Sequence, residues 1–493
     1  MGSRNAFLVT AAVLCSGRLA FPQVVAVGAV GCSTAQVLGG KKPSVHMMGP
    51  EGRFLAPIPV AKNPGEFIYS GSNNTLYVVN NEKESEHLIS ALNLTTKRVD
   101  KEIKVGAGGA ALFLSHDGRR LFCFTTGFGY LFVRKPPPPE GQPAISVVDT
   151  GSNEVVATYH WLEGFRAGVL DSIHAKWLSP GFQFLAATDQ GDLIVRYAAF
   201  QETFHEPKPV NDQFLVFSGR SALPVFTIKL AGRPRATMQS RDQKLLFAAI
   251  EGDKHTAASL LVVDIEKGTT VSHALTGQPT RLVRLGPNQE PWVLGNQEMR
   301  SLSETGELGD RRIQFSQPGR ADKGDEGGAS AFLDGFPGET IALGEDHAAV
   351  LISGKNGRSH HKVALLDLKE LQVEAIVTTM GAGEKTGVLA GRIATSVLFS
   401  AATLGTFVFT PNLILGNEFL VARPDGRFLY ALDLDDHKVS VIDAQTAKVV
   451  RRVQVDDSVQ GLRMSCDGKH LLCLGDEIQR MNLETFSFEA FLD

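Results

Sequence analysis

Short hydrophobic runs separated by turn residues recur along most of the chain, and residues 417–455 show the pattern most clearly. Residues 417–422 form a hydrophobic run that ends in Arg-Pro-Asp-Gly, and residues 428–434 form a second run. After a polar loop, residues 439–443 and 448–455 form a third and a fourth run. Val, Ile, Phe, Leu and Tyr favour strands, and Asp-Gly tolerates the backbone angles of tight turns. The stretch therefore predicts four short strands.

The same four-part pattern occurs eight times. The units cover residues 70–105, 115–160, 179–230, 240–275, 286–315, 344–379, 417–455 and 465–493. A single four-stranded sheet cannot bury both of its faces, whereas sheets repeated around an axis pack on one another and close a core. We therefore predict an all-β protein, a β-propeller of four-stranded blades, with eight blades favoured. Seven blades are the alternative, because the units at 179–230 and 286–315 are the most degenerate.

The repeat also resembles a known family. The unit PDGRFLYALD followed by VSVIDAQTAKVV, together with LYVVN at residues 76–80, is similar to the YVTN family of β-propeller repeats. That family includes surface-layer-type propellers and lactonase-like relatives. The resemblance implies a single propeller domain over residues 65–493. It transfers no catalytic residue to this chain, because the motif specifies turns and strand packing.

Four insertions interrupt the spacing of the repeats, at residues 128–143, 196–211, 316–338 and 380–412. The first contains the run KPPPPEG, and the third is rich in Gly, Asp and Lys. The fourth differs from the others, because Arg392 is the only charged residue between positions 387 and 409. We expect it to be a helix or hairpin that packs over the propeller. An exposed apolar surface for a partner or a membrane is the alternative.

The amino-terminal residues predict export. Arg4 precedes the apolar stretch 6–15, as in a secretory signal peptide. In a second interpretation the apolar core is 19–31, and Ala-Val-Gly-Cys at 29–32 resembles a lipoprotein cleavage box with a lipid anchor at Cys32. Residues 1–40 are thus predicted to be a signal peptide or apolar leader and residues 41–64 an amino-terminal extension. A retained anchor is the alternative. The expected location is the periplasm, the cell surface or the medium.

Composition excludes some classes of partner. The chain has 493 residues, 43% of them hydrophobic, and a formal net charge of −4, so no broad basic surface for nucleic acid is expected. The five cysteines form no CxxC or CxxCH motif, and the adjacent His360 and His361 lack a third ligand. We predict no metal site and no cofactor.

Other motifs are better explained by structure than by chemistry. GAGEKTG at 381–387 lacks the GK[ST] ending of a phosphate-binding loop, and no GxSxG elbow occurs. An aspartate recurs at one place in four repeats, where we expect it to cap the backbone of a turn. These residues are Asp149, Asp264, Asp367 and Asp443.

The remaining place for binding or chemistry is the mouth of the central channel. The innermost strand of each blade should be the one before the Asp-Gly-type turn, so the residues just ahead of it should line this mouth. The candidate ligand-binding residues are Arg166, Asp171, His174, Arg233, Arg235, Arg281, Glu418 and Gln460. Such a cation-rich mouth suits an anionic group or an acidic peptide.

These patterns predict an exported, non-catalytic propeller scaffold that binds a protein or ligand through its loop face. The alternative is an enzyme with its site at the channel mouth. It would be a lactonase-like hydrolase or a periplasmic propeller associated with an oxidoreductase.

Overall fold

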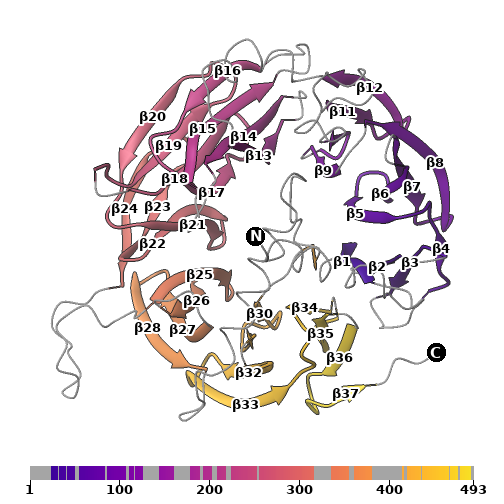
Figure 1. The fold of residues 1–493 in the computed structure, drawn as a ribbon. Helices are drawn as coiled ribbons and strands as arrows, with labels where there is room; N and C mark the ends of the chain where they lie inside the picture. Colours follow the sequence, from indigo (N-terminus) through magenta and orange to yellow (C-terminus); the bar gives the residue numbers. More distant parts are fainter. Residues whose placement is uncertain are drawn as a thin grey trace, which may run out of the picture.

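The computed structural model describes the chain over residues 24–30, 33–39, 42–49, 55–83, 86–106, 110–115, 117–125, 144–159, 178–188, 192–201, 208–217, 224–252, 255–315, 335–354, 360–379, 414–415, 419–434, 436–465, 467–475 and 478–489. Within these residues the strands form nine sheets, arranged around a common centre as the blades of a β-propeller (Figure 1).

The blades follow one another along the chain. Blade 1 contains β1 (Val24–Val30), β2 (Ser33–Leu38), β3 (Ser44–Met48) and β4 (Ile58–Pro59), with β29 (Ile414–Leu415) added beside β1. Blade 2 contains β5 (Pro64–Ser70), β6 (Thr75–Lys83), β7 (Glu86–Asn93) and β8 (Arg98–Val105). Blade 3 contains β9 (Ala110–Leu114), β10 (Arg120–Thr125), β11 (Ala144–Asp149) and β12 (Glu154–Tyr159). Blade 4 contains β13 (Leu178–Ala187), β14 (Leu193–Gln201), β15 (Lys208–Phe217) and β16 (Pro224–Lys229).

The remaining five blades have four strands each. Blade 5 contains β17 (Pro234–Gln239), β18 (Leu245–Ile250), β19 (Ser259–Asp264) and β20 (Thr270–Ala274). Blade 6 contains β21 (Pro279–Leu285), β22 (Glu290–Gly295), β23 (Glu298–Leu302) and β24 (Leu308–Gln314). Blade 7 contains β25 (Gly335–Ala342), β26 (His347–Gly354), β27 (His360–Asp367) and β28 (Gln372–Thr378). Blade 8 contains β30 (Leu420–Ala422), β31 (Phe428–Asp433), β32 (Lys438–Asp443) and β33 (Lys448–Gln454). Blade 9 contains β34 (Gly461–Met464), β35 (His470–Leu474), β36 (Ile478–Asn482) and β37 (Phe488–Glu489).

The prediction of eight blades, and the alternative of seven, are both wrong. The eight predicted units correspond to blades 2–9, including the degenerate units at 179–230 and 286–315, although six of them begin at or after the end of the first strand of the blade. The ninth blade comes from residues 24–59, which the sequence pattern assigned to a leader and an extension. The sequence of β1, VVAVGAV, is a continuous apolar run. Such a run resembles the core of a signal peptide and lacks the alternation of apolar and polar residues that indicates a strand, so the strand was not predicted.

In blades 2–9 the first strand is the innermost, as predicted, whereas in blade 1 the short β29 lies beyond β1 at the edge of the sheet. Inner strands of neighbouring blades contact one another from β1 to β5, β9, β13, β17, β21, β25, β30 and β34. The ring closes between blades 9 and 1, where Met48 packs on Leu472, Leu474 and Ile478. An Arg463 guanidinium nitrogen also donates to the carbonyl of Ser33 over 2.8 Å. Residues from the two ends of the chain therefore meet in one interface.

The hydrophobic core is divided among the interfaces between blades. The second strand of five blades carries a fully buried aromatic residue at its third position, namely Tyr77, Phe122, Phe247, Trp292 and Tyr430. Tyr77 packs with Leu121 and Val148 of the next blade, and Tyr430 packs with Leu462 of blade 9. Each blade therefore buries a face against its neighbour, which explains why the unit must be repeated.

The recurring aspartates cap turns, and this prediction is confirmed. Asp149 Oδ1 accepts hydrogen bonds from the backbone of Gly151 and Ser152, both over 3.0 Å. Asp264, Asp367 and Asp443 accept equivalent bonds in their own turns. In each of these turns the fourth residue after the aspartate has a left-handed backbone, as Asn153 does with φ of 55°. The motif therefore sets the direction of the fourth strand.

The predicted insertions lie largely outside the described residues. Only that at 196–211 is well covered, and there β14 and β15 extend the hairpin of blade 4. Nothing of residues 380–412 is described. In the part of the chain that the structure covers, no helix is long and apolar enough to span a membrane.

Candidate functional site

The candidate residues were predicted at the starts of the inner strands, around the mouth of a central channel. Of the eight predicted residues, Arg166, Asp171, His174 and Glu418 fall outside the described residues, and so does Cys32. The structure describes Arg233, Arg235, Arg281 and Gln460.

Three arginines lie on two neighbouring inner strands. Arg233 immediately precedes β17, Arg235 is the second residue of β17, and Arg281 is the third residue of β21. β17 and β21 contact each other, and all three side chains are exposed. Three positively charged residues therefore lie at the starts of two contacting inner strands, and we call this group the arginine sector (Arg233, Arg235 and Arg281).

Carboxylates neutralise only part of this charge. Arg235 Nη2 lies 2.6 Å from Glu251 Oε1, in a partly exposed ion pair. The side chains of Arg233 and Arg281 form no hydrogen bond or ion pair with any described residue. Within the described residues, no carboxylate therefore neutralises these two guanidinium groups.

Gln460 is not part of the arginine sector. It is exposed and precedes β34, and its backbone N–H donates to the carbonyl of Leu474 over 2.8 Å. The inner strands β25 and β30 lie between β34 and the arginine sector in the ring. The residue therefore lies at the start of an inner strand that is separate from those of the arginine sector.

Sequence reasoning missed two glutamates near the start of inner strands. Glu66 in β5 and Glu339 in β25 each end a Pro-Gly-Glu tripeptide, and each reaches forward to the inner strand of the next blade. Glu339 Oε2 accepts the backbone N–H groups of Phe419 and Leu420 over 2.6 and 2.9 Å. Glu66 accepts the N–H of Leu112, which holds the same register position. The repetition of the Pro-Gly-Glu tripeptide could have identified these glutamates from the sequence. Backbone N–H groups at the edge of a sheet have no strand partner, and a carboxylate can accept their hydrogen bonds.

The environment of Glu66 favours its neutral form. Burial raises the pKa of Glu66 to about 7, although the hydrogen bond from Leu112 opposes the shift. The neighbouring Cys123 thiol is fully buried, and burial raises its pKa strongly, with a smaller contribution from Glu66. Cys123 is therefore an inert core thiol, and Glu66 carries only a fractional charge near neutral pH.

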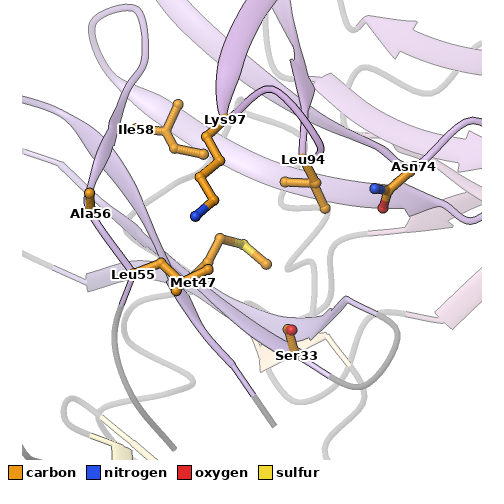
Figure 2. A pocket seen from close by; sticks show the side chains of 8 residues that line it. All are labelled: Ser33, Met47, Leu55, Ala56, Ile58, Asn74, Leu94 and Lys97. Atoms are coloured by element: carbon orange, nitrogen blue, oxygen red, sulfur yellow. The ribbon is translucent and has the colours of Figure 1, made fainter. Parts of the chain in front are cut away.

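A concave site lies on the opposite face of the ring from the starts of the inner strands. Because the strands of a blade are antiparallel, the turn β5–β6 and the turn β7–β8 lie opposite the starts of the inner strands. Here blades 1 and 2 enclose a cavity of about 200 Å³, the blade 1/2 pocket (Figure 2). Its lining consists of Ser33, Met47, Leu55, Ala56, Ile58, Asn74, Leu94 and Lys97.

Metal chemistry has no visible basis in the described part of the chain. No group of three or more His, Cys, Asp and Glu side chains is arranged there to hold a metal ion. The backbone of His360 and His361 belongs to β27. The described starts of the inner strands therefore carry guanidinium groups and hydrogen-bonded carboxylates.

Comparison with known proteins gives no family. No family model matches the sequence, and no curated protein matches it. Among solved structures, a eukaryotic initiation factor is similar with 12% identity over 91% of this chain and 93% of that chain, at a TM-score of 0.49. The dihydro-heme d1 dehydrogenase NirN is similar with 14% identity over 90% and 75%, at a TM-score of 0.43. Apo AztD from Citrobacter koseri is similar with 12% identity over 84% and 92%, at a TM-score of 0.38. The assignment of the fold rests on the nine sheets themselves.

Proposed function

We propose that the chain is an exported, non-catalytic β-propeller that binds an acidic segment of a partner protein at the arginine sector. The observation that carries this proposal is the pair of exposed guanidinium groups, Arg233 and Arg281, that have no carboxylate partner among the described residues. A rigid ring that presents unpaired cations on adjacent strands is suited to binding and needs no reacting group.

The physical argument is one of charge and geometry. Arginine presents a planar fork of donors that matches a carboxylate, so two or three neighbouring arginines favour successive acidic side chains. Glu339 lies on the neighbouring strand β25, but its carboxylate is bound to the backbone of β30. It therefore leaves Arg281 free to meet a ligand.

Export and family membership are parts of the same proposal. The cationic start and apolar stretch of residues 1–15 support export, and the similarity of the repeats to the YVTN family agrees with it.

The experiment measures binding of a fluorescein-labelled hexaglutamate peptide by anisotropy at low salt. The double variant Arg233→Gln/Arg281→Gln is expected to bind about tenfold more weakly, since each exposed pair contributes roughly 0.2–1 kcal/mol. The wild-type affinity should also fall with added salt.

The control variant Arg312→Gln/Lys229→Gln removes the same charge from exposed positions on the outermost strands β24 and β16. It should bind as the wild type does. Equal weakening in both variants would reduce the effect to net charge and contradict the proposal. Turnover of a sugar lactone by the wild type, lost in the mouth variant, would replace it with the lactonase-like alternative.

A further inference from the structure

The outer edge of blade 5 lacks the features that protect the other blades. β20 is the outermost strand of this blade, at the rim of the ring, and within the described residues no strand pairs with its outer edge (Figure 1). Its sequence, Thr-Val-Ser-His-Ala, contains no Asp, Glu, Lys, Arg or Pro, and it pairs with β19 in continuous register, without a bulge. All of its residues except His273 are exposed. A regular, exposed and uncharged edge is a template for another strand.

Each of the other eight outermost strands in the described sheets has at least one protecting feature. β8, β12, β16, β24, β28 and β33 carry charged side chains. A bulge also interrupts the pairing of each of them with the third strand of its blade. β4 and β37 contain only two residues each. Charges, bulges and shortness prevent edge strands from pairing with other chains, so β20 differs from the rest in being open to a partner strand.

The register of β20 determines which backbone groups this edge presents. The backbone N–H of Leu275 donates to the carbonyl of Ala258 over 2.9 Å, so residue 275 points its backbone groups into the sheet. Hydrogen-bonded pairs alternate along an antiparallel ladder, and the register of β19 and β20 is continuous. Every second residue of β20 therefore points its backbone N–H and C=O groups outward. These residues are Thr270, Ser272 and Ala274.

The strand that matches this edge is a second copy of it. We propose that two copies of the chain pair antiparallel along β20, about a two-fold axis at Ser272. Ser272 then faces its own copy and Thr270 faces Ala274, and each facing pair exchanges two hydrogen bonds, which uses all of the outward groups. Val271 faces His273, so no two like charges stand opposite each other. The pairing joins two four-stranded blades into one continuous sheet.

Charge and length decide how such a dimer behaves. In the same arrangement β33 would bring the like charges of Lys448, Arg451 and Arg452 together, whereas β20 carries none. β20 has only five residues, so the contact buries less surface than a stable interface does. The dimer should therefore be weak and form reversibly at high protein concentration. This pairing is independent of the arginine sector, which lies on the inner strands β17 and β21.

Sedimentation velocity of the full chain, from micromolar to millimolar concentration, tests the pairing. The average sedimentation coefficient of the wild type should rise toward that of a dimer. Ser272→Pro removes an outward N–H that no described residue accepts, and proline is tolerated on an edge strand, so thermal melting should show a folded chain. Its self-association should be weaker by about tenfold or more, since two hydrogen bonds are lost at the axis. A wild type that stays monomeric at millimolar concentration would overturn the proposal.

A charge exchange at Ser272 makes the test specific. Ser272→Lys and Ser272→Glu each place like charges opposite each other, so each variant alone should associate severalfold more weakly than the wild type. An equimolar mixture should recover the association, because lysine then faces glutamate. Val450→Lys is the control, since Val450 on β33 is 53% exposed and Val271 on β20 is 56% exposed, and it should associate as the wild type does. A mixture that does not recover, or equal weakening in Val450→Lys, would assign the contact to another surface and overturn the proposal.

Discussion

Two buried tyrosines occupy the same register position but have different hydroxyl environments. The Tyr77 hydroxyl donates to Asn153 Oδ1 over 2.8 Å and accepts from Asn73 Nδ2 over 3.0 Å. The Tyr430 hydroxyl is buried with no hydrogen-bond partner among the described residues. Tyr430 packs against blade 9, as Tyr77 packs against blade 3. In the turn of blade 9 the position of Asn153 is taken by Phe486, the fourth residue after the turn-capping Asn482, and the side chain of a phenylalanine cannot accept a hydrogen bond.

The two tyrosines should therefore respond in opposite ways to loss of the hydroxyl. Tyr77→Phe leaves buried partners unsatisfied and should lower the free energy of unfolding by roughly 1–2 kcal/mol. Tyr430→Phe removes an unsatisfied group and should leave that free energy unchanged or raise it by up to about 1 kcal/mol. Urea unfolding of both variants checks this, and equal destabilisation would contradict the assigned environments.

Glu66 should make the stability of the ring depend on pH. Its folded pKa of about 7 lies above the ordinary value of 4.5, so the folded state prefers the protonated form. The resulting stabilisation is complete below pH 4.5 and is lost as the pH rises through 7. By linkage the loss amounts to about 3 kcal/mol at most.

Glu66→Gln should remove this slope, because the amide oxygen still accepts the N–H of Leu112 and carries no charge. The measurement is the free energy of unfolding of wild type and variant at pH 5 and pH 8. Glu154→Gln, an exposed glutamate on the outermost strand β12, is the control and should keep the wild-type slope. An unchanged slope in Glu66→Gln would show that another group is responsible.

At the scale of elements, the sequence predicted those features that depend on neighbouring residues of one repeat, such as the turn-capping aspartates. Asp367 binds two N–H groups within three residues of itself, so its role can be inferred from a short repeat. Glu66 and Glu339 act on the next blade, and a single unit contains no information about that partner. Of the candidate arginines, Arg233 precedes an inner strand as expected, whereas Arg235 and Arg281 lie within inner strands, and their grouping depends on which blades are neighbours.

Blade 1 shows why part of the candidate site could not be predicted. Its strands lack the Asp-Gly turn and the capping aspartate of the repeat, and β1 is apolar along its whole length. The blade 1/2 pocket takes five of its lining residues from this unrecognised blade and three from blade 2. A pocket between two blades could not be inferred while one of them was assigned to a leader and an extension.

At the scale of the molecule, the amino-terminal strands complete the ring. β1 pairs antiparallel with β2 at six residue pairs and parallel with β29 at two. β1 also contacts β5 of the next blade. Cleavage before Cys32 would remove β1 and leave the inner edge of β2 without its partner.

A chain that begins at Ser33 should therefore melt below a chain that begins at Val24. The lost ladder corresponds to a few kcal/mol, and in a chain of this length each kcal/mol shifts the melting temperature by about 1 °C, so we expect it to be lower by roughly 2–5 °C. Both chains can be made with an added methionine and compared by circular dichroism, with the full chain as reference. The chain from Val24 should match the full chain. If the chain from Ser33 melted at the same temperature, β1 would be dispensable and a mature protein anchored at Cys32 would keep a closed ring. A lowered melting temperature would instead favour a leader that ends before Val24, because export would then preserve all nine blades.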